Sequence, residues 1–193
     1  MDNTPSRYDR KLILWAVITP QIIMLSISAL WILIFPKDNI MKYLKFTPVF
    51  FAKGFLVGAI LGLAGYLFYI FAKKTKLFYE AVELFEVVLS PAFKNLQFLD
   101  LLILSSVSGF SEEVFFRGLL FPKIGIILSS IAFGIMHLPK KKFWIYAVWA
   151  TGSGFLFAYL LKMTGSLWIP ITAHAINNLI GMILLKNLTK SQN

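Results

Sequence analysis

The sequence contains no cysteine, which excludes disulfide bonds, thiolate zinc sites and a cysteine nucleophile. Charged side chains are also scarce: they make up 15% of the 193 residues, against about 25% in soluble domains. Apolar residues instead account for 58% of the chain, and the mean hydropathy is +0.75. This composition excludes a disordered chain and an ordinary soluble enzyme, and it indicates a polytopic membrane protein.

Acidic residues are few as well, with 9 Asp and Glu against 19 Lys and Arg and a net charge of +10. The basic residues lie mostly between the apolar runs, where anionic lipid headgroups would supply the counter-charge. No basic patch with interleaved aromatic residues lies outside these runs, as a nucleic-acid-binding surface would need. We therefore expect the lipid bilayer as a partner and no nucleic acid.

Long uncharged runs predict the membrane spans, since about 20 apolar residues cross a hydrocarbon layer about 30 Å thick. Open strand edges cannot be satisfied in lipid, so the fold class is all-α, a bundle of about six transmembrane helices in a single domain of residues 1–193. The spans are residues 12–35, 54–72, 143–161 and 167–185, with two more between 98 and 138 that break near 121–123. The first is too long for a signal-peptide core and is interpreted as a retained span.

Small residues recur in the second of these spans. Gly54, Gly58, Gly62 and Gly65 follow one another at intervals of about four, which places them near one face of a helix. Such a face lets a neighbouring helix approach closely, so we expect tight helix packing there.

The segment 73–99 differs from the spans because it carries three carboxylates. Glu80, Glu83 and Glu86 fall three residues apart, on one side of a helix. This pattern argues against spanning and predicts an amphipathic helix lying in the membrane interface. Pro91 is expected to end that helix.

The basic residues also predict an orientation. Counting Lys and Arg in alternate loops places most of them inside if the termini are cytoplasmic, as the positive-inside rule requires. The short chain and its many Lys and Ile residues are typical of a bacterial protein. We therefore expect a multi-pass protein of a bacterial cell membrane with cytoplasmic termini.

Six polar residues stand out because they lie within or beside the apolar segments. An ionisable side chain at the bilayer centre costs at least about 2.5–3.5 kcal/mol on insertion scales, so it persists where it faces a protein interior. The set includes both histidines of the chain and the only arginine beyond residue 10. Its members are Glu112, Glu113, Arg117, His137, His174 and Asn178.

Helical spacing groups these residues into pairs. Glu113 and Arg117 are four residues apart and can pair on one helix face, and the interval recurs at His174 and Asn178 and at residues 133–137. Three helices would then each bring polar groups to one site inside a bundle. The motif-bearing half of the chain is about residues 98–187.

Carboxylate and imidazole groups in a shielded cavity suit the activation of a water molecule. Glu112 is the candidate general base, and His137 can hold or polarise the water. His174 and Asn178 can donate hydrogen bonds to an oxyanion that forms on a substrate carbonyl. These four are the predicted catalytic residues.

The same residues resemble a known family. Residues 112–117 fit the pattern EExxxR, residues 133–137 fit FxxxH and residues 174–178 fit HxxxN. Together and in this order they resemble the CAAX-protease and bacteriocin-processing family (CPBP, also called Abi). The resemblance covers about residues 101–187 and implies an all-helical intramembrane endopeptidase.

Roles follow from matching positions in those motifs. The resemblance implies that Glu112 and His137 activate water, and that His174 and Asn178 stabilise an oxyanion or, in another description, bind metal. Glu113, Arg117 and Phe133 are supporting residues. Phe133 is interpreted as packing, and Glu113 with Arg117 can equally be a structural ion pair.

A metal cofactor is left open by the residues. Two His and one Glu suffice for a catalytic zinc site, and the family is described as metalloprotease, so Glu112, His137 and His174 would be the ligands. Their spacing is not H-E-x-x-H, however, and they come from three separate helices. A metal-free, glutamate-type mechanism is preferred.

The resemblance also implies a substrate class, a peptide or protein. It would be a prenylated CAAX-type C-terminus or a bacterial peptide precursor such as a bacteriocin or pheromone, with self-immunity as a physiological role. The alternative is a non-catalytic membrane protein. It would be a transporter with a proton relay through Glu112, Glu113 and the histidines, or an immunity protein that binds a membrane target.

Overall fold

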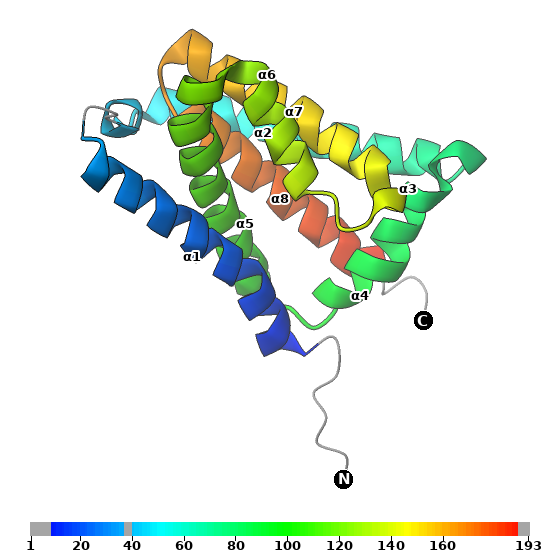
Figure 1. Ribbon diagram of the computed structural model, residues 1–193. Helices are drawn as coiled ribbons and strands as arrows, with labels where there is room; N and C mark the ends of the chain where they lie inside the picture. Colours follow the sequence, from blue (N-terminus) through cyan, green and yellow to red (C-terminus); the bar gives the residue numbers. More distant parts are fainter. Residues whose placement is uncertain (1–8, 37–39, 189–193) are drawn as a thin grey trace.

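The computed structural model describes residues 9–36 and 40–188, and this part of the chain is helical without strands (Figure 1). Six long helices form the bundle: α1 (Arg10–Ile34), α2 (Pro48–Ala72), α5 (Phe98–Glu113), α6 (Phe121–Met136), α7 (Trp144–Thr164) and α8 (Trp168–Leu188). Short α-helices are α3 (Tyr79–Glu83) and α4 (Ser90–Phe93), and π-helical turns are η3 (Leu84–Leu89) and η4 (Val114–Leu120). Single 3₁₀ turns are η1 (Ile40–Tyr43), η2 (Lys76–Phe78) and η5 (Lys141–Phe143). The expected all-α class is confirmed.

Five helical segments among the described residues are long and apolar enough to cross a membrane, where about six spans were expected. The difference arises because α5, η4 and α6 form one helical run, Phe98–Met136. The chain reverses inside this run at Gly125, with φ 79° and ψ 173°, and not at residues 121–123. Glycine adopts this conformation without the steric cost of a Cβ atom.

After the reversal at Gly125, the remaining part of α6 is short and runs back alongside η4. Residues 126–136 rise about 16 Å at 1.5 Å each, roughly half of a hydrocarbon layer about 30 Å thick. His137 follows directly and caps this helix. This short part of α6 therefore places His137 in the middle of the bundle and not at its far end.

The segment with the three carboxylates is helical and is not among the apolar spans, as expected. Glu83 accepts a hydrogen bond from Lys142 at 2.6 Å, and Glu86 pairs with Lys73 at 3.0 Å. The prediction that Pro91 ends the helix is wrong, because α4 continues to Phe93. Pro91 lies in the first turn of α4, directly after the π-helical η3. Proline is tolerated there, because the N–H group that it lacks would have no hydrogen-bond partner within a first helical turn. The interfacial location stays a prediction.

Helix α8 is held between α2 and α5, as Figure 1 shows. A Cβ atom on Gly54 or Gly58 would lie 2.6 or 2.5 Å from backbone oxygens of α8, and one on Gly62 would lie 2.8 Å from an α8 side chain. Gly109 of α5 approaches the α8 backbone from the other side, at 2.8 Å. The expected glycine packing is thus confirmed at three positions, while Gly65 instead faces a tryptophan of α7 at 3.8 Å.

Polar contacts tie the ends of the helices together. Arg10 at the start of α1 pairs with Asp100 at the start of α5 at 2.6 Å, and Lys186 near the end of α8 donates to the backbone carbonyl of Leu96. At the other end of the bundle, Trp168 at the start of α8 donates to the chain beside η1. The described ends of α1 and α8 thus lie on one side, as Figure 1 shows. The termini themselves lie outside the described residues.

Candidate active site

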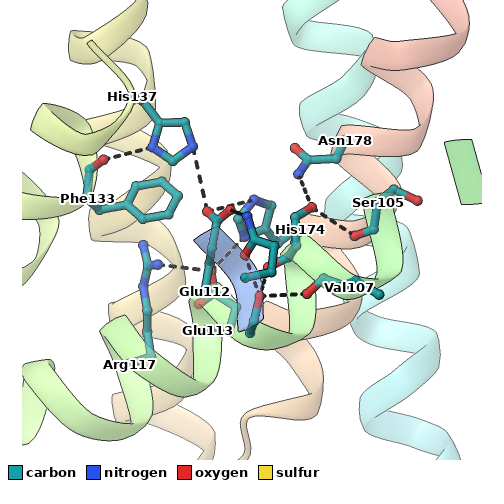
Figure 2. A network of polar contacts seen from close by, with 12 residues as sticks. Ser105, Val107, Glu112, Glu113, Arg117, Phe133, His137, His174 and Asn178 are labelled. Atoms are coloured by element: carbon teal, nitrogen blue, oxygen red, sulfur yellow. Dashed lines mark hydrogen bonds and ion pairs between the residues drawn. The ribbon is translucent and has the colours of Figure 1, made fainter. Parts of the chain in front are cut away.

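The predicted polar residues gather where α5, η4, α6 and α8 meet (Figure 2). Glu112, Glu113, Arg117 and His174 are buried, and the His137 side chain is 24% exposed. Glu112 and Glu113 end α5, directly before the π-helical η4. Single π-helical turns are frequent at functional sites, and this one carries Arg117 beneath the two carboxylates.

Arg117 is fully buried and is held by both charge and rings. Its Nη1 donates to Oε1 of Glu113 at 2.9 Å, which is the i,i+4 pair expected from the spacing. The guanidinium carbon lies 4.2 Å from the ring centroid of Phe133, so Phe133 packs as expected and adds a cation–π contact. This buried pair fixes Glu113 beneath His174.

Glu113 determines which nitrogen of the His174 ring carries the hydrogen. Its Oε1 lies 2.8 Å from Nδ1 of His174, and an ionised carboxylate can only accept a hydrogen bond. Nδ1 therefore carries the hydrogen, and Nε2 of the neutral ring is an acceptor. Phe157 stacks on the other side of this ring, with centroids 5.3 Å apart and planes inclined by 22°, so the imidazole has one orientation.

His137 is fixed in the same way from its own helix. Its Nδ1 lies 2.8 Å from the backbone carbonyl oxygen of Phe133, which only accepts, so its Nε2 also presents a lone pair when the ring is neutral. This Nε2 lies 3.6 Å from Oε2 of Glu112, and Nε2 of His174 lies 3.9 Å from the same oxygen.

Three acceptor atoms thus face one another: Nε2 of His137, Nε2 of His174 and Oε2 of Glu112. Like lone pairs repel, so a shared proton, a water molecule or a cation is needed between them. Oε2 is buried and has no hydrogen-bond partner among the described residues. The separations from the two ring nitrogens are too long for direct hydrogen bonds. The arrangement suits a water molecule that donates to the carboxylate and to an imidazole.

A metal would have to use the same three side chains. Among residues 9–36 and 40–188, no group of three or more His, Asp or Glu side chains is arranged to hold a metal ion. Glu112, His137 and His174 are the side chains that would hold a metal, with two ring nitrogens at 3.6 and 3.9 Å from Oε2 of Glu112.

Asn178 lies one turn beyond His174 on α8, at the edge of the cluster (Figure 2). Its Nδ2 donates to Oγ of Ser108 at 3.0 Å. An amide nitrogen carries two hydrogens, so one remains for another acceptor. Asn178 and His137 line the same cavity, which makes this second hydrogen available to a bound molecule.

That cavity has a volume of about 440 Å³ and opens beside the polar cluster. Its walls come from α2, the segment of α3 to α4, α7 and α8, and they are rich in aromatic rings such as Tyr69, Phe85 and Tyr146. An apolar pocket with a few converging polar groups is the usual form of a ligand site. The cavity can therefore bind an apolar group with His137 and Asn178 at its wall.

Sequence reasoning missed two polar partners of the site. Gln21 of α1 donates from Nε2 to Oε1 of Glu112 at 3.0 Å, and Ser108 accepts from Asn178. A signal was available for the first, because Gln21 is the only amide side chain in the uncharged run 12–35. No comparable signal marks Ser108, since serines are frequent in apolar helices and pack between them.

Comparison with known proteins finds a family that matches the motif-bearing part of the chain. Residues 94–180, a little under half of the chain, match the model of the family Type II CAAX prenyl endopeptidase Rce1-like. This segment contains all three motifs, so the resemblance seen in the sequence is confirmed over it. No solved structure matches the chain.

Three relatives from Bacillus subtilis (strain 168) are similar over part of their length. The uncharacterized protein YpbD is 33% identical over 76 residues, and YdiL, named as a candidate membrane peptidase, is 36% identical over 93 residues. The uncharacterized protein YyaK is 35% identical over 91 residues. The matches cover 39%, 44% and 40% of this chain, and 40%, 36% and 30% of the relatives. With its apolar helices, the chain is a multi-pass membrane protein.

Proposed function

We propose that this protein is an intramembrane endopeptidase that hydrolyses a peptide bond with water activated by Glu112. The premise is that its residues 94–180 match the Rce1-like family of CAAX prenyl endopeptidases. The observation that carries the proposal is the convergence of Nε2 of His137 and Nε2 of His174 on Oε2 of Glu112, at 3.6 and 3.9 Å. Oε2 has no other partner among the described residues, so it is free to take a proton.

Hydrolysis can be written with these groups alone. A water molecule between Oε2 of Glu112 and Nε2 of His137 attacks the substrate carbonyl carbon as its proton passes to Glu112. The new C–O bond gives a tetrahedral oxyanion. When the C–N bond breaks, Glu112 returns the proton to the leaving amine nitrogen, and the carboxylate is regenerated. Each proton that leaves the water is thus accounted for.

The oxyanion needs donors placed in advance. The second Nδ2 hydrogen of Asn178 is one, because the first is already donated to Ser108. His174 becomes a donor at Nε2 only when its ring is protonated, because Nδ1 already carries the hydrogen that faces Glu113. Arg117 holds Glu113 in place. Glu113 and Arg117 are thus positioning residues in this proposal.

The aromatic cavity supports a substrate with an apolar group beside the scissile bond. Its volume of about 440 Å³ and its position against His137 and Asn178 accommodate such a group while the carbonyl faces the polar cluster. The proposed substrates are a prenylated CAAX-type C-terminus or a bacterial peptide precursor, in processing or in self-immunity.

We also propose that the chain is a single membrane domain of a bacterial cell membrane, with both ends cytoplasmic. The contacts that bring the start of α1 and the end of α8 to one side of the bundle support this. Since the chain has no cysteine, one introduced by Thr75→Cys can be labelled without background. An impermeant thiol reagent added to intact cells should leave it unlabelled, and external labelling would contradict the orientation.

The proposal is tested with the purified protein in liposomes. Apolar peptides, with and without a prenylated C-terminus, are presented in the same membrane, and cleavage is followed by mass spectrometry, which also identifies the bond. We expect hydrolysis at one bond. The competing function is a proton relay through the same cluster. If no peptide is cut and the liposomes instead acidify in response to a pH gradient, the endopeptidase proposal is wrong.

A further inference from the structure

Gln21 connects helix α1 to the candidate base. Its side chain is buried, at 6% exposure, and its Nε2 donates to Oε1 of Glu112 at 3.0 Å. Its Oε1 accepts from Oγ of Ser111 at 2.5 Å. Helix α1 lies outside the segment 94–180 that matches the family, so nothing in that match assigns a role to Gln21.

The orientation of the Gln21 amide follows from its two partners. An ionised carboxylate only accepts, so the NH₂ group must face Glu112 and the carbonyl oxygen must face Ser111. The Ser111 hydroxyl has one hydrogen and also lies 2.7 Å from the carbonyl oxygen of Val107. Donating to Gln21 satisfies the buried amide oxygen, and the pair thereby holds the amide in one of its two flips.

We propose that Gln21 is a positioning residue for Glu112, an inference that rests on the proposed function. By occupying Oε1, Gln21 leaves Oε2 as the oxygen that faces His137 and His174. The carboxyl group would otherwise rotate freely about its terminal torsion, which has broad minima. A base must be within reach of the proton that it takes, and a misplacement of about 1 Å can cost about 100-fold in rate.

Other contacts anchor α1, so the role of Gln21 can be separated from the packing of its helix. Arg10 makes two hydrogen bonds to Asp100, at 2.8 and 2.6 Å. Ser28 is buried in the same helix, but its hydroxyl donates to the carbonyl of Met24 within α1. A change at Ser28 therefore perturbs a buried polar residue of α1 without touching the cluster.

The test compares Gln21→Met, which keeps the volume and removes the amide donor, with Ser28→Ala as the matched control. In the peptide-cleavage assay we expect Gln21→Met to lower kcat by about 10- to 100-fold while KM changes less than about 2-fold. Ser28→Ala should keep the kcat of the unmodified protein. Equal kcat for Gln21→Met and the unmodified protein would overturn the inference and leave the proposed function intact.

A second measurement does not depend on cleavage. The thermal unfolding midpoint in detergent is recorded for Gln21→Met, for Glu112→Leu and for the double variant. If Gln21 binds the carboxylate, the downward shift caused by Gln21→Met should shrink once Glu112 is gone. Shifts that simply add would overturn the inference whether or not the protein cleaves peptides, whereas failure of the endopeptidase proposal would show only as absent cleavage.

Discussion

Replacing Glu112 with glutamine removes the proposed base and keeps the shape of the side chain. The glutamine has one oxygen and one NH₂ group, and Gln21 already donates toward the position of Oε1. The new carbonyl oxygen will therefore face Gln21, and the new NH₂ group will face Nε2 of His137 and of His174. In the unmodified protein three acceptor atoms face one another, whereas in the variant an NH₂ donor lies between the two ring nitrogens. We therefore expect Glu112→Gln to fold with undiminished stability.

The expected loss of activity follows from the role of Oε2. General base catalysis contributes about 100- to 10,000-fold to a rate, which corresponds to about 3–5 kcal/mol of activation free energy. The NH₂ group of glutamine cannot accept a proton, and it would also occupy the two ring nitrogens that orient the water. We therefore expect kcat to fall by at least about 100-fold in Glu112→Gln.

The assay is cleavage of a membrane-presented peptide by protein in liposomes, with kcat and KM determined separately. Glu80→Gln is the matched control, because Glu80 lies on α3, away from the polar cluster, and undergoes the same change of charge. Unfolding midpoints show that both variants are folded. If Glu112→Gln retains more than about a tenth of the kcat of the unmodified protein, the assignment of Glu112 as the base is refuted.

Three further predictions concern packing, pH and metal. Gly58→Ala should lower both the unfolding midpoint and kcat, since its Cβ would lie 2.5 Å from a backbone oxygen of α8, whereas Gly152→Ala, which has open space around it, should change neither. Hydrogen bonding from Tyr69, with Lys73 alongside, lowers the pKa of the Glu86 carboxyl from 4.5. The ionised Glu86 therefore stabilises the folded state above about pH 4.5, and this contribution is lost as the pH falls through the lowered pKa. Acid unfolding should therefore start at higher pH in Tyr69→Phe, and an unshifted transition would contradict this cause. Treatment with a chelator should leave cleavage unchanged, and loss of activity restored by zinc would show that the metal-free mechanism is wrong.

Patterns within single helices were predictable because they depend on local spacing. The absence of charge over long runs was enough to predict the membrane spans. The i,i+4 interval was enough to predict the ion pair of Glu113 and Arg117, which is observed at 2.9 Å. The face of Gly54, Gly58 and Gly62 was predictable for the same reason, since residues four apart share a helix face. The three motifs were sufficient for the family, which the match over residues 94–180 supports.

Local patterns failed where the chain departs from regular α-helix. The reversal was expected near Pro122 but occurs at Gly125, because a proline is tolerated in a first helical turn whereas a positive φ favours glycine. The same tolerance let the helix pass Pro91. Phe98–Met136 counts as one of the five apolar helical segments, although the reversal at Gly125 divides it into two parts that run in opposite directions.

The sequence by itself determined that the chain is a helical membrane protein and which polar residues had to avoid lipid, since composition and spacing are properties of the chain alone. Only the tertiary structure decided how these residues meet: which nitrogen of each histidine faces Oε2 of Glu112, and that Gln21 of a distant helix occupies Oε1. Hydrogen-bond direction depends on partners brought together by helix packing, across about 90 residues in the case of Gln21 and Glu112, and no local pattern encodes such a pairing.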